Sequence, residues 1–157
     1  MADGPYSGES AGYDDRVHRG WPGLAPADGL PPLLDLSLDS GTLHTARARI
    51  RACASRAGFG ENQTEDMVLA VHELAANVIR HGGGAGRLRV WTLARALLCQ
   101  VDNDVAAEFA ANSLPCEPGH GLWVVRQVAS QVQTLSGPAG TSVQVRFDRA
   151  ADGIPPR

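Results

Sequence analysis

The chain has 157 residues, 43% of them hydrophobic and 20% charged, which is enough apolar material for the core of one domain. No run of about 18 apolar residues occurs, which argues against a membrane-spanning helix. The formal net charge is −3, and residues 1–35 carry six acidic but only two basic side chains. The remainder is close to neutral, so a nucleic-acid-binding surface is not expected.

The three cysteines, Cys53, Cys99 and Cys116, are widely spaced and odd in number. They match neither a disulfide framework nor a zinc site. The N-terminus has no basic start and no apolar stretch typical of a secretory signal. These features together predict a reduced, cytoplasmic setting.

Residues 1–32 are rich in Gly, Pro, Ser and Asp and show no hydrophobic period, which predicts a disordered N-terminal tail. Trp21 lies within it, between a glycine and a proline, as is typical of a loop residue. From residue 33 onward the pattern changes. We predict one folded domain over 33–148 and a short C-terminal tail over 149–157.

The folded domain begins with leucines that alternate with polar residues over 34–38, the period of a half-buried strand. Two amphipathic helices follow, ending at Gly58 and at the glycine run 82–84. The remaining predicted elements are strands over 88–93 and 97–101, an irregular segment to 119, a helix over 122–131, and strands over 132–135 and 141–147. This order predicts an α+β fold, a two-layer sandwich with a mixed, mostly antiparallel sheet packed on three helices.

The second predicted helix carries Glu73, Asn77 and Arg80 at positions i, i+4 and i+7, so the three side chains share one face. Such a row suits a metal–phosphate ligand. Asn offers an oxygen to Mg²⁺, Arg can bind phosphate, and Glu can accept a proton. Taken alone, the same pattern is more typical of a solvated helix face with an intrahelical ion pair.

Three further segments could contribute to a nucleotide site. Asp102 ends a strand, where a carboxylate can accept a hydrogen bond from an exocyclic amine, although Asp also favours turns there. The Gly-His-Gly turn at 119–121 leads into an apolar helix, so its N–H groups could bind phosphates, or it is a plain loop. Thr141 offers a hydroxyl to a base or simply follows a hairpin turn.

The order of these segments is more specific than any one of them. The patterns E-L-x-x-N-x-x-R-H-G at 73–82, G-x-G-L-x-x-V at 119–125 and G-T-x-V-x-x at 140–145 resemble the Bergerat-fold ATPase superfamily. The chain looks most like the bacterial anti-sigma-factor serine/threonine kinases, over about residues 33–147. The resemblance implies a kinase that uses ATP and Mg²⁺, phosphorylates a small anti-anti-sigma protein of the STAS type and sequesters a sigma factor. The resemblance is compatible with a homodimer, and it implies no direct nucleic-acid or membrane partner.

The resemblance also implies roles for individual residues. Glu73 would be the catalytic base toward the acceptor hydroxyl, and Asn77 would be the Mg²⁺ ligand. Asp102 would bind the adenine amine, with Thr141 nearby. The remaining nucleotide-binding residues, which border the phosphates or end the lid over them, would be Arg80, His81, Gly119, Gly121 and Leu122.

Two departures from the family pattern bear on catalysis. Asp104 stands where the family usually has the glycine of D-x-G, and the lid over 105–118 is short. A second hypothesis is therefore a non-catalytic ATP-binding switch that controls partner binding. Transfer to a histidine is less favoured, because no dimerisation helix with an acceptor His precedes the domain. The arginines of the first helix (Arg47, Arg49, Arg51 and Arg56) form either a solvated face or a docking patch for the partner.

Overall fold

The computed structural model describes residues 30–81, 85–103, 121–137 and 140–150. These residues form three helices and a five-stranded sheet. In chain order the elements are β1 (Leu34–Leu38), α2 (Leu43–Arg56), α3 (Glu61–His81), β2 (Gly86–Leu93), β3 (Ala96–Asn103), α5 (Gly121–Val128), β4 (Gln131–Gly137) and β5 (Gly140–Asp148). This is the predicted order of elements.

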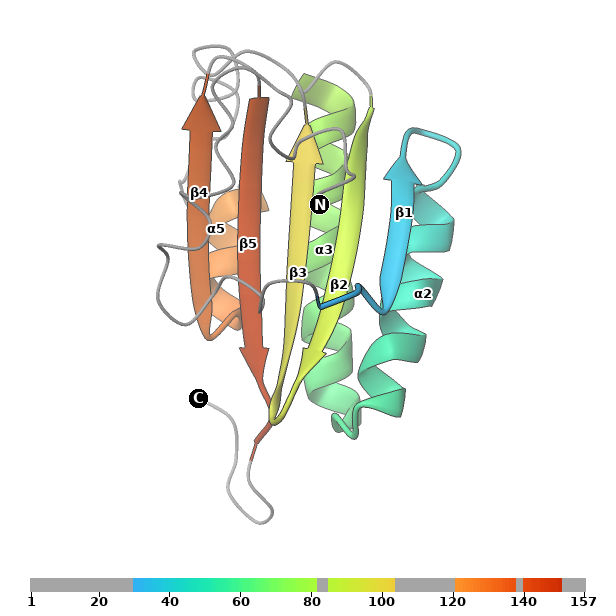
Figure 1. Cartoon of the computed structure of the whole chain (residues 1–157), viewed down its shortest axis with the longest axis vertical. Helices are drawn as coiled ribbons and strands as arrows, with labels where there is room; N and C mark the ends of the chain where they lie inside the picture. The colour runs from blue at the N-terminus through green and yellow to red at the C-terminus, as the bar shows by residue number, and fades with distance from the viewer. Residues whose placement is uncertain (1–29, 82–84, 104–120, 138–139, 151–157) are drawn as a thin grey trace.

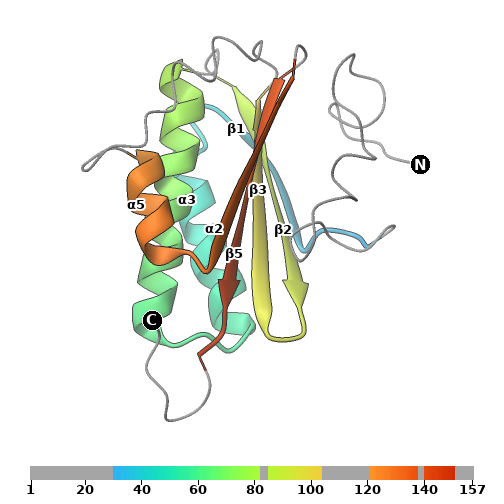
Figure 2. The same cartoon turned by 90° about the vertical axis from the view of Figure 1, so that its left-hand side faces the viewer.

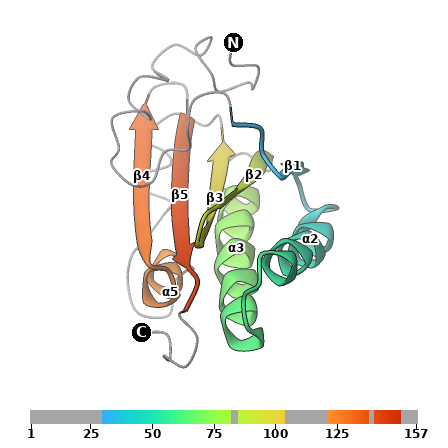
Figure 3. The same cartoon turned by 60° about the horizontal axis from the view of Figure 1, so that its bottom comes forward.

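The strands lie in the order β1-β2-β3-β5-β4 (Figure 1). Every neighbouring pair is antiparallel, so the sheet is antiparallel throughout rather than mixed. All three helices lie on one face of the sheet (Figure 2), and α3 lies between α2 and α5 (Figure 3). The predicted α+β sandwich with three helices is therefore confirmed.

The hydrophobic core lies between the helices and the side of the sheet that faces them. Alternate residues of a strand point to opposite faces, and on β3 it is Leu97, Cys99 and Val101 that point toward the helices. Burial raises the pKa of the Cys99 thiol far above its usual range, which makes it an inert core thiol. The helices contribute mainly small and branched side chains to this core, among them Ala46, Ile50, Val71, Leu74, Ala75 and Val125, together with Met67.

The helix α2 ends where the sequence predicts it to end. Gly58 has a φ of +87°, which a residue with a side chain rarely adopts. In this conformation the amide of Gly58 donates to the carbonyl of Ser55 and that of Phe59 donates to Ala54. These two bonds satisfy the last carbonyl groups of the helix and turn the chain into α3.

The helix α5 is shorter than predicted. It ends at Val128 rather than near Gln131, because the sheet takes over the following amides. Ala129 still donates to the carbonyl of Val125, but Ser130 donates to Arg146 of β5. Pairing with β5 thus outcompetes one more turn of helix.

Residues at both predicted domain edges take part in the fold. The amide of Leu33 donates to Val90, and the carbonyl of Leu30 accepts a 2.9 Å hydrogen bond from Nε1 of Trp91. At the other edge, the amide of Arg149 donates to the carbonyl of Arg95. None of the helices in the described ranges is long and apolar enough to cross a membrane.

Candidate functional site

One end of the sheet gathers several of the segments that carry the sequence motifs. β3 ends there at Asn103, which lies directly opposite Thr141 near the start of β5. β2 begins at the same end, and the C-terminal half of α3 lies there too (Figure 1). The C-terminus of α5 leads into the start of β4 at the opposite end of the sheet. The N-terminus of α5 therefore points toward the end where β3 finishes. We call this the site end of the sheet.

Asn77 lies on α3 at the site end and is only 4% exposed. Its Oδ1 accepts a 3.0 Å hydrogen bond from Nη2 of Arg80, one turn further along the helix. Its Nδ2 is buried and has no hydrogen-bond partner among the described residues. A buried polar atom without a partner costs about 1–3 kcal/mol unless a ligand or water satisfies it. Asn77 therefore offers a position for a polar ligand.

Glu73 and Arg80 flank Asn77 along the same face of α3. Glu73 is half-buried and makes no hydrogen bond or ion pair with any residue that the structure describes, whereas Arg80 is exposed. His81 is the last residue of the helix, and its side chain lies outside the described part of the chain. The spacing thus places a carboxylate, an amide and a guanidinium along one stripe, while the roles of these residues stay predictions.

The helix α3 approaches the sheet closely at the site end. A Cβ atom on Gly86, the first residue of β2, would lie 2.6 Å from Cγ1 of Val78 and 2.4 Å from the carbonyl oxygen of Asp102. Only a glycine fits in this space without a shift of the backbone. The side chain of Val78, next to Asn77, therefore lies directly against the start of β2.

Thr141 and Asn103 lie on the side of the sheet that faces the helices. Both continue the inward alternation of their strands, because Val101 and Val143 belong to the core. Thr141 is 1% exposed and Asn103 is 5% exposed. The hydroxyl of Thr141 is buried without a hydrogen-bond partner among the described residues. The site end therefore holds two buried polar atoms in need of partners, on Asn77 and on Thr141.

Asp102 points to the opposite face of the sheet. It alternates with Val101 and Asn103 along β3, and its carboxylate is fully buried. This carboxylate accepts hydrogen bonds from Nη2 of Arg89 at 2.8 Å and from Nε2 of Gln100 at 3.0 Å. The structure thus engages Asp102 in a polar network away from the helices and does not bring it together with Asn77.

Asn103 is a polar residue at the site end that the sequence motifs did not single out. The signal was present in the strand itself, because apolar residues at 97, 99 and 101 set the inward phase and place 103, not 102, next on that side. A one-residue shift along a strand moves a side chain to the other face.

The glycine turn that was predicted to border the phosphates is only partly visible. Gly119 lies outside the described residues, and Gly121 begins α5. Leu122 is buried and belongs to the core, so it anchors the first turn of α5 against the other helices. The first turn of α5 carries no acidic residue, which leaves its positive end uncompensated by charge within the turn.

The donor set at the site end can be compared with what Mg²⁺ requires. Mg²⁺ takes six oxygen ligands and is commonly held by one or two protein groups, with phosphate oxygens and waters completing the shell. No cluster of three or more His, Cys, Asp or Glu side chains occurs in the described ranges. The side-chain oxygen of Asn77, next to an arginine that could bind phosphate, fits a metal that is held mainly by its nucleotide.

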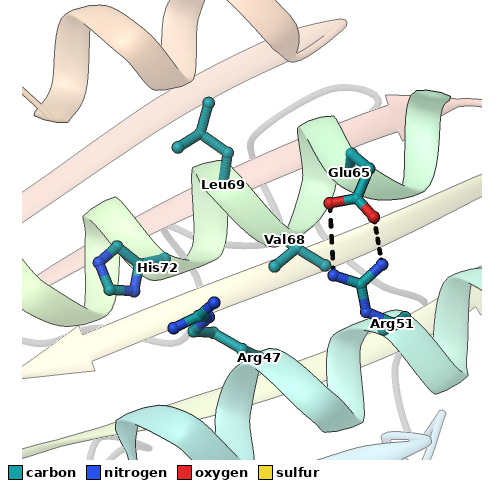
Figure 4. Close-up of a pocket in the computed structure, with 6 residues that line it drawn as sticks. All are labelled: Arg47, Arg51, Glu65, Val68, Leu69 and His72. Carbon is teal, nitrogen blue, oxygen red and sulfur yellow. Dashed lines mark hydrogen bonds and ion pairs between the residues drawn. The ribbon is translucent and has the colours of Figure 1, made fainter.

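A second feature is a pocket of about 260 Å³ between α2 and α3, away from the site end (Figure 4). Arg47 and Arg51 line it from α2, and Glu65, Val68, Leu69 and His72 line it from α3. We call it the α2–α3 pocket. The guanidinium of Arg51 binds the carboxylate of Glu65 through two hydrogen bonds and so lowers the pKa of that carboxyl. Arg47 makes no hydrogen bond or salt bridge to any residue in the described part of the chain.

Comparison with known proteins places the chain in a family. Residues 36–147 match the sequence model of the histidine kinase-like ATPase domain. One similar solved structure contains the RsbU and RsbW domains of Rv1364c from Mycobacterium tuberculosis, with 19% identity and a TM-score of 0.62. Another is the SiaB–SiaC complex from Pseudomonas aeruginosa, with 10% identity and a TM-score of 0.59.

These likenesses differ in coverage. The first match covers 81% of this chain but only 35% of the mycobacterial chain, so this chain spans about a third of that protein. The second covers 74% of this chain and 89% of the other. No curated protein sequence matches the chain. At such identities the structural likeness concerns the fold alone.

Proposed function

The chain belongs to the histidine kinase-like ATPase domain family, and from this premise we propose that it is an ATP- and Mg²⁺-dependent serine/threonine kinase that acts as an anti-sigma factor. It would phosphorylate a small anti-anti-sigma protein of the STAS type and sequester a sigma factor. The resemblance of residues 73–82 to the anti-sigma-factor kinases supports this choice within the family. The observation that carries the proposal is the environment of Asn77, a buried amide with one unpartnered atom on the same helical face as Glu73.

In this proposal, Asn77 and Arg80 bind the phosphate end of the nucleotide. The amide oxygen of Asn77 would be the protein ligand of Mg²⁺, and the guanidinium that holds this oxygen at 3.0 Å would turn to a phosphate. Bound Mg²⁺ supplies positive charge that neutralises the phosphate oxygens during transfer. The unpartnered Nδ2 of Asn77 provides a donor for a phosphate oxygen or an ordered water.

Glu73 is the residue proposed for the chemical step. The acceptor hydroxyl oxygen bonds to the γ-phosphorus, the bond from that phosphorus to the β–γ bridging oxygen breaks, and ADP leaves with the electron pair. The proton of the hydroxyl passes to the Glu73 carboxylate, or is held by it until transfer is complete. No described residue ties this carboxylate down, so it can turn to an incoming hydroxyl.

We further propose that the base is recognised by Asn103 and Thr141, and that Asp102 has a structural role. This assignment is supported by the inward direction of the first two and by the buried, unpartnered hydroxyl of Thr141. The side-chain oxygen of an Asn can accept from the exocyclic amine of adenine, as a carboxylate does, but without the charge. We therefore expect a weaker hold on adenine than an inward Asp would give.

The partner is proposed to dock at the α2–α3 pocket. Its rim carries Arg47, which has no described partner, and its floor carries Val68 and the exposed Leu69, 43% of whose surface is open to solvent. An exposed guanidinium beside an apolar floor suits a partner segment that combines a carboxylate with aliphatic side chains.

Two measurements test the proposal. Titration calorimetry with ATP, with and without Mg²⁺, tests binding, and no heat at millimolar ATP would rule out the kinase and any ATP-dependent switch together. Incubation with ATP labelled at the γ-phosphorus and a candidate STAS-type protein tests transfer. Label on a serine or threonine of that protein supports the kinase. ATP binding that alters partner affinity without any label would support the rival, a non-catalytic switch.

A further inference from the structure

The face of the sheet that points away from the helices is more buried than an uncovered face should be. We call it the outer face. Its central side chains are Arg89, Trp91, Leu98, Gln100, Asp102, Ser142 and Gln144, which are paired across β2, β3 and β5. Of these, Leu98, Asp102, Ser142 and Gln144 are 0% exposed, and Gln100 is 2% exposed.

No described helix lies on this side of the sheet, because α2, α3 and α5 all lie on the other (Figure 2). The side of an antiparallel sheet that carries no covering layer faces water and keeps its side chains partly exposed. The described stretch that leads into β1 reaches the outer face at Leu30, whose carbonyl accepts a hydrogen bond from Trp91. Burial of the central side chains in this single chain therefore requires cover from another part of the same chain.

The outer face also holds polar atoms that need partners. Nε2 of Gln144 donates a 2.7 Å hydrogen bond to Oε1 of Gln100. Nε2 of Gln100 in turn donates to the carboxylate of Asp102, so a chain of hydrogen bonds crosses from β5 to β3. Yet Oε1 of Gln144, Oγ of Ser142 and Nε of Arg89 are buried without a partner among the described residues. One acceptor, one hydroxyl and one donor are thus left open, a set that the carbonyl and N–H groups of an extended peptide can satisfy.

The chain enters the described structure on this same face. Nε1 of Trp91 donates a 2.9 Å hydrogen bond to the carbonyl of Leu30, the first described residue. Trp91 also packs on Leu98 and lies under the guanidinium of Arg89, whose central carbon is 5.6 Å from the ring centre. The end of the N-terminal segment is therefore fixed at the edge of the buried patch.

From these observations we propose that residues 1–29 fold back over the outer face and cover it, with the stretch 21–29 lying across β3 and β5. Nine extended residues span up to about 30 Å, whereas two neighbouring strands are only about 5 Å apart, so the stretch is long enough. It carries Trp21 and Leu24 as apolar side chains for the cluster around Leu98. The segment holds five acidic residues against two arginines, which suits the open donor of Arg89.

The test uses Trp91 as the only tryptophan, in a Trp21→Phe, Trp123→Phe background. The quenching of its fluorescence by acrylamide is compared between the full chain and a chain that starts at Leu30. Both are measured at a concentration at which sedimentation gives monomers, and both are checked for a cooperative thermal transition. Removal of 1–29 is expected to raise the quenching constant several-fold. A matched chain that lacks 151–157 instead should leave it unchanged.

An unchanged quenching constant after removal of 1–29 would overturn the proposal, because another segment would then cover the face. A second outcome would also overturn it. If Trp91 of the full chain loses its shielding on dilution from dimer to monomer, a second copy of the chain covers the face.

A second measurement serves if the shortened chain does not fold. Trypsin cleavage after Arg19 is timed in the intact folded chain and in an isolated peptide of residues 1–29. Cover of the sheet by 21–29 predicts cleavage at least about tenfold slower in the folded chain, and equal rates would overturn the proposal. Neither measurement involves nucleotide, so its outcome is independent of the proposed kinase function.

Discussion

Glu73 and Asn77 lie one helical turn apart on α3, but their surroundings suit different tasks. Asn77 is buried and held by Arg80, which favours a fixed ligand position. Glu73 is half-buried and has no described partner, which favours a group that meets a substrate from solvent. Binding and chemistry should therefore be separable by substitution at these two positions.

We expect Asn77→Ala to lower the affinity for ATP in the presence of Mg²⁺ by at least about tenfold, because a metal ligand is lost. The loss should be smaller without Mg²⁺. Titration calorimetry at matched Mg²⁺ concentrations measures both values. Asn62→Ala is the matched control, since this exposed asparagine lies in the first turn of the same helix. Equal effects of Mg²⁺ on the wild type and on Asn77→Ala would contradict the assignment.

Glu73→Gln should separate binding from transfer. The amide keeps the shape of the side chain but cannot accept the proton, so we expect ATP affinity within about twofold of the wild type and transfer slower by roughly 10²–10⁴-fold. Single-turnover transfer to the partner measures the rate. Glu61→Gln, an exposed change at the start of α3, is the control. Transfer at the wild-type rate in Glu73→Gln would remove Glu73 from the mechanism.

Substitution of the two neighbours at the end of β3 should affect different properties, ATP affinity for Asn103 and stability for Asp102. Asn103→Asp places a carboxylate on the inward side and is expected to tighten ATP binding by about tenfold, since a charged acceptor adds about 1.5 kcal/mol. Asp102→Asn removes a charge beside Arg89 on the outer face and should lower stability without changing ATP affinity. Calorimetry and thermal melting of both variants measure these effects. Weaker ATP binding in Asp102→Asn alone would restore Asp102 as the base-recognising residue.

At the scale of the elements, the helices are held in place by a few backbone positions. α2 and α3 are joined by a tight connection whose geometry depends on the positive φ of Gly58. α3 meets the sheet at Gly86, where a side chain has no room. These positions determine how accurately Asn77 lies over the ends of β2 and β3.

Gly58→Ala should destabilise the fold by roughly 1–2 kcal/mol, because an L-residue is strained at a φ of +87°. The added Cβ would also lie 2.7 Å from Nη1 of Arg149, a flexible end that can move aside. The free energy of unfolding in urea measures the loss. Gly60→Ala is the control, since a Cβ there meets nothing within 4 Å. A Gly58→Ala protein as stable as Gly60→Ala would mean that the connection relaxes freely.

The sequence predicted the elements well where periodicity and end signals agree. The alternation over 34–38 and the glycine after α2 each have a local physical cause, so they needed no tertiary information. The end of α5 was placed too late, because the competing partner of Ser130 is Arg146 in β5, a contact set by the sheet.

The site also divides into local features, which could be predicted from the sequence, and features that depend on tertiary packing. The spacing of Glu73, Asn77 and Arg80 is a property of one helix and could be predicted. The inward position of Asn103 was available from the phase of its strand, but the burial of Asn77 depends on how closely α3 approaches Gly86. That approach is a property of the packed sandwich and could not be derived from the helix alone.

At the scale of the whole molecule, the two proposed interactions of α3 use successive stretches of one helix. The α2–α3 pocket includes Leu69 and His72, and the nucleotide stripe begins at Glu73. Leu69 lies one helical turn before Glu73, so the two sets of residues adjoin along the helix. Leu69 and Asn77 are also separated by about 12 Å along the axis. A partner on the pocket could therefore sense nucleotide through α3 without touching it.

This separation leads to a prediction about the partner. Arg47→Glu reverses the charge at the rim of the α2–α3 pocket, so we expect it to weaken capture of an acidic, apolar partner segment by at least about tenfold. ATP affinity should stay within about twofold, because Arg47 lies on α2, away from the site end. Partner affinity at two salt concentrations and ATP calorimetry measure the two effects.

Arg95→Glu is the matched control for that change, since it makes the same reversal on an exposed residue in the turn between β2 and β3. Long-range electrostatics alone would affect both variants alike and would be screened by salt beyond about 10 Å. A specific contact at the pocket would affect Arg47→Glu far more than Arg95→Glu, with a difference that persists at 0.15 M salt. Equal weakening by the two reversals would place the docking surface elsewhere, and loss of ATP binding in Arg47→Glu would mean that the pocket and the site end are not separate surfaces.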